Sequence, residues 1–404
     1  MKILFTAYIV DPDVGSEPQC AWEWIQAAVL EHHDVHVITT PESADLINLK
    51  ANQMGRKNLR AYPVPVPKEC NFLNYELNMY IQYRKWQKSL SYYVTTRYLQ
   101  DVDIAHHLSW GNIGLGTGLS KLNIPYVFGP AGGGTVADTR LKYFFGKDWK
   151  TEKLRTQLRR AYLFSPFSRR SARKAQIVLA ANDATYKLAK RLGAKKIQLF
   201  LPDGIRVNQI LKVRVFQTDL TAIYVARFML RKGANLAILA FAETLKQFPN
   251  ARLTMVGDGP EWNSCQELVK ELGIEDSVTF TGRIPWDEVQ QRYKQARVFI
   301  FSSLRDTIGA QVLEAAAKGV PIITLENSGV SQWLPPGGAI VSKLGSKSET
   351  IKNLSNSINQ VFYYSKEEWL NSSKIANNWA VKNSWKSKTS EMNEIYKEIY
   401  RSWQ

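Results

Sequence analysis

The sequence predicts an α/β protein built from two Rossmann-like domains. With 404 residues, the chain is too long for a typical single hydrophobic core, so two domains are expected. Both halves of the chain alternate short apolar strands with helices, which is the pattern of an open parallel sheet covered by helices. The chain also begins in Rossmann-like order, with a strand (2–8), a loop containing Gly15 (11–18), a helix around Trp22 and a second strand (35–39).

The remaining apolar runs divide the chain into a first domain (1–205) and a second domain (219–383), joined by a linker (206–218) that lacks clean periodicity. Further strands of the first domain are expected at 58–67, 103–108, 126–134, 177–181 and 197–201. In the second domain, strands are expected near Leu220, Leu253, Val278, Val298, Pro321 and Ala339, and helices near Ala234, Pro260, Pro285 and Gly309. The final segment (384–404) is amphipathic, with one apolar side formed by Met392, Ile395, Tyr396 and Ile399.

The net charge of +17 is unusual, and one short segment supplies more than half of it. Residues 140–174 hold 12 Lys or Arg against two acids, a net charge of +10. Aromatic side chains lie among these charges: Tyr143, Phe144, Phe145, Trp149, Tyr162, Phe164 and Phe167. This mixture suits an anionic membrane surface. Nucleic acid is the second polyanion that fits, but no nucleic-acid-binding signature is present, and the third alternative is a solvated basic helix with aromatic core positions.

The cysteines and the apolar runs predict a cytoplasmic protein. Cys20, Cys70 and Cys265 are scattered, odd in number and form no CxxC pair, so neither a disulfide framework nor a zinc site is expected. No run of 18 apolar residues occurs. The first residues lack the long apolar region of a signal peptide.

A pair of cations and a pair of acids in the second half form the most informative pattern. Arg227 ends a strand and Lys232 follows five residues later, while Asp306 and Glu314 flank a turn that opens a helix near Gly309. A helix N-terminus presents free N–H groups and about half a positive charge, so it suits a phosphate. Two nearby cations would complete a diphosphate site. The alternative is a buried helix with surface charges on either side.

This pattern resembles the C-terminal, donor-binding domain of retaining family-4 glycosyltransferases of the GT-B type. The family has Arg-x4-Lys after its first strand and two acids separated by seven residues, and the segments MVGDGP (255–260) and VTFTGRIP (278–285) are also similar. The chain departs from the family in one respect, because the first acid is Asp306 instead of the usual Glu. The resemblance implies two domains facing across a cleft, with the C-terminal helix (384–404) crossing back to an acceptor-side first domain.

The resemblance also implies roles for the second-domain residues. Arg227 and Lys232 would pair with the diphosphate of a nucleotide sugar, and backbone groups at Ile308, Gly309 and Ala310 would add N–H donors. Glu314 would bind the ribose of the nucleotide, and Asp306 would contact hydroxyls of the transferred sugar. Retention of configuration would follow front-face substitution, with the leaving phosphate helping to deprotonate the acceptor.

Candidate residues of the first domain lie at strand ends. The words GSEP and AWEW resemble the N-terminal loop of a family-4 subgroup, in which Gly15 would let the backbone approach the ligand. Glu17 would bind the acceptor or cap its own helix. The turn with Gly132 and Gly133 follows a strand end, where open α/β sheets bind ligands.

Histidines and acidic pairs complete the set of candidates. The place where many family-4 enzymes carry a sugar-contacting His is occupied here by 130–134, PAGGG. His106 and His107 come from another strand and either line the cleft or are structural. The pairs Asp11/Asp13 and Asp101/Asp103 are interpreted as loop chemistry and not as metal sites, because Arg227 and Lys232 would neutralise the leaving group.

The predicted function is therefore that of a retaining, metal-independent hexosyltransferase of polysaccharide or glycolipid biosynthesis. It would move a sugar from a nucleotide-diphosphate sugar to a lipid-linked or glycan acceptor, with no cofactor, and would act as a peripheral protein on the inner face of the cell membrane. Two alternatives remain open at this stage. One is a catalytically silent GT-B subunit that binds nucleotide or glycan, and the other is a GT-B nucleotide-sugar epimerase or hydrolase.

Overall fold

The structure is a computed structural model that describes residues 1–15, 17–66, 75–95, 101–212 and 214–404. Cys70 and Ser16 of the GSEP segment lie outside the described residues. The chain forms two compact units. The first comprises Met1–Gly134, Gln157–Pro202 and Trp385–Gln404, and the second comprises Thr135–Thr156 and Asp203–Ser384.

The first unit is built on a seven-stranded parallel sheet of order β3-β2-β1-β4-β5-β6-β7. Its strands are β1 (Lys2–Ala7), β2 (Asp34–Thr39), β3 (Leu59–Pro63), β4 (Ile104–Ser109), β5 (Tyr126–Ala131), β6 (Ile177–Ala180) and β7 (Ile197–Leu199). Its helices are α1 (Glu17–Leu30), α2 (Pro41–Gln53), α3 (Tyr75–Tyr93), α6 (Pro166–Lys174), α7 (Asp183–Leu192) and α14 (Trp385–Trp403). Apolar clusters cover both faces of this sheet, as expected for parallel strands.

The second unit repeats this architecture with a six-stranded parallel sheet of order β10-β9-β8-β11-β12-β13. Its strands are β8 (Thr221–Val225), β9 (Arg252–Val256), β10 (Val278–Gly282), β11 (Val298–Phe301), β12 (Ile322–Leu325) and β13 (Ala339–Ser342). Its helices are α4 (Lys142–Phe145), α8 (Ala234–Leu245), α9 (Trp262–Glu271), α10 (Trp286–Gln295), α11 (Ala310–Ala317), α12 (Lys347–Tyr363) and α13 (Lys366–Lys382). The two Rossmann-like sheets confirm the predicted fold class.

The strand order reverses once in each sheet, between β1 and β4 in the first unit and between β8 and β11 in the second. Loops that leave two neighbouring strands at such a point diverge to opposite faces of the sheet and leave a crevice at the carboxyl ends of the strands. The predicted site residues follow these four strands or lie close to them in the chain. The topology therefore brings together residues that are far apart in sequence.

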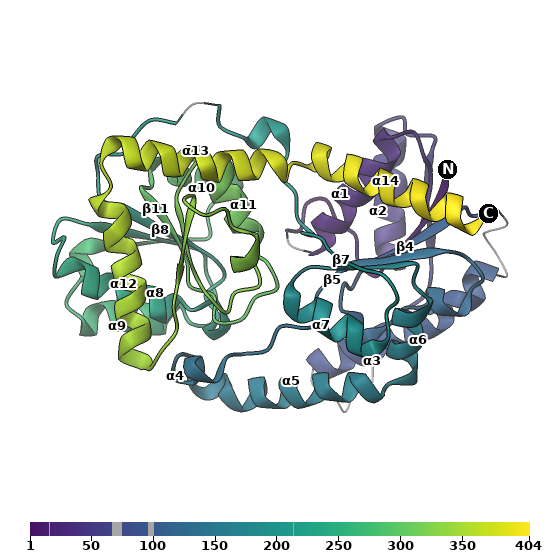
Figure 1. Cartoon of the computed structure of the whole chain (residues 1–404), viewed down its shortest axis with the longest axis horizontal. Coiled ribbons are helices and arrows are strands. Elements are labelled where there is room, and N and C mark those ends of the chain that lie inside the picture. The colour runs from purple at the N-terminus through teal and green to yellow at the C-terminus, as the bar shows by residue number, and fades with distance from the viewer. Residues whose placement is uncertain (16, 67–74, 96–100, 213) are drawn as a thin grey trace. The chain divides into compact units, whose positions relative to one another are not determined.

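The C-terminal helix α14 belongs to the first unit, as predicted. It lies beside α1 (Figure 1), and Met392, Ile395, Tyr396 and Ile399 are part of the core on that side of the first sheet. The buried ammonium of Lys388 donates a hydrogen bond of 2.6 Å to the carbonyl oxygen of Leu201. The amphipathic helix α14 thus packs in the same hydrophobic core as the first strand of the chain.

Residues Thr135–Thr156, which we call the insert, are surrounded in sequence by the first unit but pack with the second. Leu141, Phe144 and Phe145 are fully buried in the core of the second unit. The amide of Asn235 on α8 donates a hydrogen bond of 3.0 Å to the carbonyl oxygen of Phe144. The insert is therefore an integral part of the second unit, although the sequence placed all of 1–205 in the first domain.

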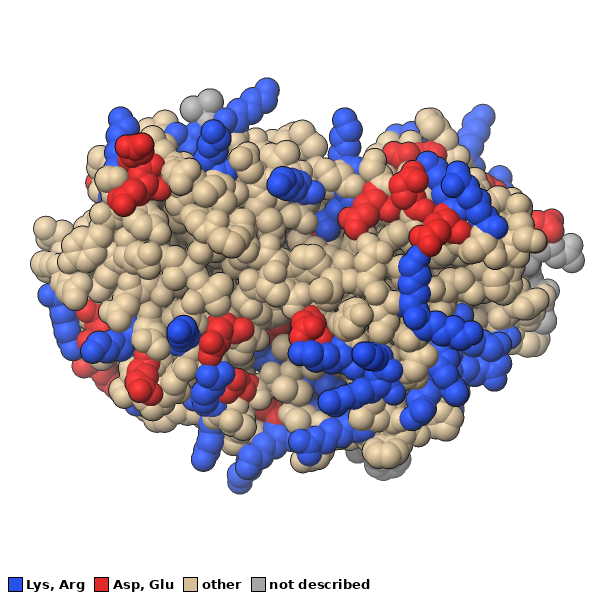
Figure 2. All heavy atoms as spheres, in the orientation of Figure 1, with Lys and Arg blue, Asp and Glu red and all other residues tan. Residues whose placement is uncertain are grey.

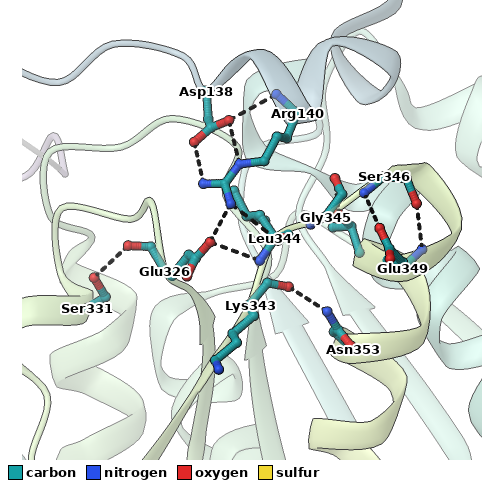
Figure 3. Close-up of polar contacts among 11 residues, drawn as sticks. Asp138, Arg140, Glu326, Ser331, Lys343, Leu344, Gly345, Ser346, Glu349 and Asn353 are labelled. Atoms are coloured by element: carbon teal, nitrogen blue, oxygen red, sulfur yellow. Dashed lines mark hydrogen bonds and ion pairs between the residues drawn. The ribbon is translucent and has the colours of Figure 1, made fainter.

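A three-residue ion-pair cluster fastens the start of the insert (Figure 3). The guanidinium of Arg140 lies 2.7 Å from a carboxylate oxygen of Asp138 and 2.8 Å from one of Glu326, which follows β12. It also donates to the carbonyl oxygen of Leu344 at 3.2 Å, while the Glu326 carboxylate accepts from the Leu344 amide at 3.1 Å. These bonds tie the insert to the loops at the carboxyl ends of β12 and β13.

The basic segment 140–174 contains both buried and exposed residues, so it does not form a single exposed surface. Helix α5 (Trp149–Ala161) begins in the insert and ends in the first unit. Among the seven aromatic residues named above, Phe144 and Phe145 are core residues, whereas Tyr143 and Phe164 are exposed by 58% and 83%. Phe144 and Phe145 therefore fit the alternative of a basic segment with aromatic core positions.

The helices in the described part of the chain include none with the length and apolarity required to cross a membrane.

Candidate functional site

The predicted cations and acids of the second unit follow β8 and β11 in the chain. Arg227 lies two residues after β8, and Lys232 ends a short turn (Leu230–Lys232) beyond it. Asp306 lies in the loop between β11 and α11, and Glu314 lies on α11 itself. Because β8 and β11 are neighbours at the point where the strand order reverses, all four residues come from loops and helices at one edge of the sheet.

Lys232 and Asp306 form an ion pair between the ammonium and one carboxylate oxygen. Both side chains are largely buried, with 11% and 16% of their surface exposed. The same carboxylate oxygen accepts a bond of 3.2 Å from the hydroxyl of Ser303, and the other accepts from the amide of Thr307 at 3.1 Å. An ammonium has three N–H donors, so Lys232 keeps the capacity to bind an incoming anion while it holds Asp306.

Close backbone approach fixes the position of Lys232. Gly233 has a φ of +69°, and a Cβ atom there would lie 2.1 Å from the carbonyl oxygen of Ser302. The hydroxyl of Ser302 donates back to the carbonyl oxygen of Gly233 at 2.8 Å, and the Tyr224 hydroxyl donates to that of Lys232 at 3.1 Å. Only glycine combines this left-handed conformation with so short a distance, so a glycine after Lys232 is a structural requirement of the turn.

The start of α11 lies beside this pair in sequence. Its first residue is Ala310, and Gly309 precedes it with a φ of +145°. Ile308 is buried, with 3% of its surface exposed, whereas Arg227 is exposed. The buried Ile308 anchors the loop, and the exposed Arg227 guanidinium is accessible to a ligand in solution.

Glu314 is half-buried on the second turn of α11. Burial raises the pKa of this carboxyl above its usual range, while a hydrogen bond with Trp286 and the charge of Lys318 partly offset the effect. A partly buried carboxylate destabilises the fold when its hydrogen bonds and nearby charges do not fully compensate for the lost water. Such a costly placement is common at binding sites.

The sequence did not predict the charged residues that surround Asp306. Glu152 of the insert has 2% of its side chain exposed, and its carboxylate pairs with Arg155 at 2.7 Å and with Arg305 at 2.7 Å. Burial lowers the pKa of Arg231, with the charge of Asp306 acting in the opposite direction. The one sequence signal for this cluster is that Arg305 directly precedes Asp306.

In the first unit, Glu17 connects α1 to the loop after β4. Its carboxylate accepts a hydrogen bond of 2.6 Å from the amide of Gly111, whose carbonyl oxygen accepts from Gly132 at 2.5 Å. Gly133 has a φ of +99°, and a Cβ atom there would lie 2.3 Å from the side-chain oxygen of Asn112. Glu17, Gly132 and Gly133 therefore lie at one edge of the first sheet. Gly15 is exposed, with no protein atom within 4 Å of an added Cβ.

His106 and His107 are both fully buried on β4. The Nε2 atom of His106 bonds to the carbonyl oxygen of Gly129, and Nδ1 lies 2.6 Å from the hydroxyl of Tyr396. His107 bonds to the hydroxyls of Thr6 at 2.8 Å and Tyr83 at 3.1 Å. Burial lowers the pKa of His106 to about 4 and that of His107 to about 3. With both nitrogens of each ring engaged inside the core, the geometry favours the structural alternative for both residues.

One aspartate of each acidic pair accepts hydrogen bonds from backbone amides. A carboxylate oxygen of Asp11 accepts from the amides of Asp13 at 2.8 Å and Val14 at 3.2 Å, which is an Asx turn. Asp103 accepts from the amide of Lys2 at 2.7 Å. Within the described residues, no group of three His, Cys, Asp or Glu is placed to hold a metal ion.

Comparisons with known proteins agree with this architecture. Residues 208–369 match the family model for glycosyl transferases group 1. An alpha-monoglucosyldiacylglycerol synthase from Streptococcus pneumoniae is 35% identical over 116 residues, which are 29% of this chain and 26% of that protein. A GDP-mannose-dependent alpha-(1-6)-phosphatidylinositol monomannoside mannosyltransferase from Mycolicibacterium smegmatis is 30% identical over 122 residues, 28% of this chain and 32% of that one. The chain thus aligns with about a quarter to a third of the length of these curated relatives.

Two solved structures resemble the whole chain. A sucrose-phosphate synthase from Thermosynechococcus elongatus has a TM-score of 0.71 at 17% identity, with 99% of each chain covered. The Anabaena protein HepE, solved in complex with UDP, has a TM-score of 0.66 at 14% identity, with 98% of this chain and 100% of that one covered. Together with the two Rossmann-like units and the returning C-terminal helix, these similarities define a protein of the GT-B fold.

Within that class, residues 208–369 are similar to glycosyl transferases group 1 of the family-4 type.

Proposed function

We propose that this protein transfers a sugar from a nucleotide-diphosphate sugar to a lipid-linked or glycan acceptor, with retention of configuration. The observation that supports this proposal best is the Lys232–Asp306 pair beside the start of α11, at the reversal point of the second sheet. The relatives named above are a glycolipid synthase and a phosphatidylinositol mannoside mannosyltransferase, and the HepE structure contains UDP. Both relatives act on lipids, which supports a lipid-linked acceptor here.

In this mechanism, the second unit holds the donor. Arg227 and Lys232 would bind the diphosphate and stabilise the charge that grows on it as the bond from the anomeric carbon to the phosphate oxygen breaks. Backbone N–H groups at the start of α11 would share that task. Asp306 would accept hydrogen bonds from sugar hydroxyls, and Glu314 from the ribose. The acceptor oxygen would bond to the anomeric carbon on the face from which the phosphate leaves and would give its proton to that phosphate.

Thermal unfolding in the presence of nucleotides tests this proposal directly. The intact protein would be heated with UDP, GDP, ADP and CMP, and with the sugar derivatives of each. A nucleotide at 100 times its dissociation constant stabilises the native state by about 2.7 kcal/mol, which raises the melting temperature measurably. We expect one nucleotide to act in this way and Arg227→Ala to abolish the shift.

The matched control is Lys246→Ala, which removes an exposed cation just after α8 that pairs with Glu243. It should leave the nucleotide shift unchanged.

If no nucleotide stabilises the wild-type protein, the donor assignment is overturned. If nucleotide sugars bind but no acceptor is ever glycosylated, the silent-subunit alternative replaces the proposal, and turnover without an acceptor would indicate an epimerase or hydrolase.

We further propose that the protein acts at the cytoplasmic face of an anionic membrane, contacted through one face of α5. Leu154 and Leu158, one turn apart, are exposed by 60% and 52%, and Phe164 beyond the helix is exposed by 83%. Lys150, Lys153 and Arg160 on the same helix are also exposed, and Lys150 lies one turn before Leu154. Figure 2 shows Lys and Arg gathered over α5 and α6. Apolar side chains bordered by cations are typical of helices that lie in a membrane interface.

Vesicle co-sedimentation tests the membrane contact. Each Lys or Arg near an anionic surface adds about 1 kcal/mol of attraction, so binding to phosphatidylglycerol vesicles should exceed binding to phosphatidylcholine vesicles and weaken with salt. Leu154→Ser together with Leu158→Ser should reduce it. Leu49→Ser, at an equally exposed leucine of α2, is the control. Equal binding by all variants would exclude α5 as the contact.

A further inference from the structure

The carboxylate of Glu152 is one of the most deeply buried charges among the described residues. Only 2% of its side chain is exposed, although it lies on α5, a helix whose opposite face is basic and open to solvent. One carboxylate oxygen is 2.7 Å from a guanidinium nitrogen of Arg155 and 3.2 Å from one of Arg305, and the other oxygen is 2.7 Å from Nε of Arg305. A carboxylate removed from water to this extent requires such pairing.

Arg305 is the residue immediately before Asp306, and its guanidinium is largely buried, with 19% of its side chain exposed. The two carboxylates in this cluster have separate partners. Glu152 takes Arg155 and Arg305, while Asp306 takes Lys232. Arg231 adds a further cation close to both carboxylates. Because cations outnumber carboxylates here, the partner of each carboxylate is not fixed by charge alone.

Both ends of this arrangement are anchored. The insert that carries Glu152 is held by the Asp138–Arg140–Glu326 cluster (Figure 3) and by the buried Phe144 and Phe145. The loop that carries Arg305 is held through the carbonyl oxygen of Arg231, which accepts from the amide of Leu304 at 2.9 Å and the hydroxyl of Ser303 at 3.2 Å. Glu152 therefore meets Arg305 in a preorganised position.

We propose that Glu152 is a positioning residue for the donor site: it holds the Arg305 guanidinium away from Asp306, so that Asp306 remains paired with Lys232 and oriented toward the donor sugar. This inference rests on the proposed function of the Lys232–Asp306 site. Without the Glu152 charge, Arg305 would need another carboxylate partner, and Asp306 follows it directly in the chain. Asp306 would then be shared between two cations, and Lys232 would lose its fixed position.

The test compares three variants of the full chain: Glu152→Gln, Arg305→Gln and the double variant. The probe is UDP-glucose, or GDP-mannose if UDP gives no thermal shift with the wild-type protein. We expect Glu152→Gln to weaken binding of the probe about tenfold or more, the effect expected when a charged hydrogen bond is misdirected. The double variant should recover most of that loss, because it removes the guanidinium that competes for Asp306.

This rescue separates positioning from a merely structural role. If Glu152 only stabilised the fold, removing Arg305 as well would leave binding as weak as in Glu152→Gln or weaker, and that result would overturn the inference. The matched control is Asp148→Asn, which neutralises an exposed acid of the same insert and should leave binding unchanged.

Hydrogen exchange provides a readout that does not depend on the donor. Peptides covering residues 303–314 should lose protection in Glu152→Gln and regain it in the double variant. If the wild-type protein binds no nucleotide, the proposed function fails, while the exchange pattern still decides whether Glu152 positions this loop. Unchanged protection in Glu152→Gln would refute the positioning role even if nucleotide binding is intact.

Discussion

Glu314 occupies a position that is unfavourable for a carboxylate. Burial raises its pKa above that of a free side chain, so the folded protein binds this proton more tightly than the unfolded chain does. The stability of the fold therefore decreases as pH rises from the unfolded pKa of Glu314 to its folded pKa, and the full penalty is present above the folded pKa. A residue that costs stability and lies on α11 beside the Asp306 loop is best explained by a binding role.

Glu314→Gln should accordingly raise the melting temperature at pH 7, because the amide has no charge to desolvate. The gain should shrink as pH falls, because the wild-type carboxyl then becomes protonated and no longer carries a buried charge. Binding of the stabilising nucleotide should fall by about tenfold or more, the usual scale for losing a hydrogen bond to a charged group. Differential scanning calorimetry with and without the nucleotide measures both effects. Glu267→Gln, at an exposed position of α9, should change neither by more than about 0.5 kcal/mol.

At the scale of elements, the contact between β4 and α14 determines how the first unit responds to acid. His106 on β4 bonds to Tyr396 on α14 and is fully buried beside His107. The pKa values of about 4 and about 3 lie below the value of about 6.5 for an exposed imidazole. The unfolded chain thus binds more protons than the folded one between pH 6.5 and pH 4, and stability falls as pH decreases through this window.

Each of these histidines should contribute a slope of about 1.4 kcal/mol per pH unit in that window. His106→Gln should therefore reduce the pH dependence of the urea midpoint between pH 6.5 and pH 4.5, in addition to lowering stability at all pH values. His32→Asn is the control, because His32 is exposed and asparagine tolerates its φ of +61°. An unchanged slope in His106→Gln would show that His106 is protonated in the native state.

The same elements show why the sequence predicted some features and not others. Arg227 and Lys232 lie in the turn that follows β8, and Asp306 and Glu314 lie in the loop and helix that follow β11. Local sequence patterns and the family resemblance were therefore enough to place these residues after strand ends. The burial of His106 and His107 depends on β4 lying inside a sheet that is covered on both faces. The Glu152–Arg305 pair joins residues 153 positions apart, and no local periodicity encodes such a contact.

At the scale of the whole molecule, cations and a helix terminus would take the place of a metal at the donor diphosphate. We therefore expect turnover to be unchanged by a chelator such as EDTA, measured as sugar transfer with and without added Mg²⁺ or Mn²⁺. Lys232→Ala should lower turnover by a factor of about 100 or more, the scale observed when a group that stabilises leaving-group charge is removed. Loss of activity in EDTA that Mg²⁺ or Mn²⁺ restores would contradict metal independence and would reopen Asp11/Asp13 and Asp101/Asp103 as ligands.

The insert also determines how this protein can be recombined with its relatives. A chimera that exchanges only residues 203–384 would leave behind Leu141, Phe144 and Phe145, which fill the core of that unit, together with the Arg140 anchor and Glu152. The transferable module is therefore discontinuous, and its smallest complete form joins Thr135–Thr156 to Asp203–Ser384. If donor specificity had changed during evolution by exchange of the whole second unit, crossovers would have been needed at both ends of the insert. Crossovers at both ends of residues 203–384 would have been needed as well.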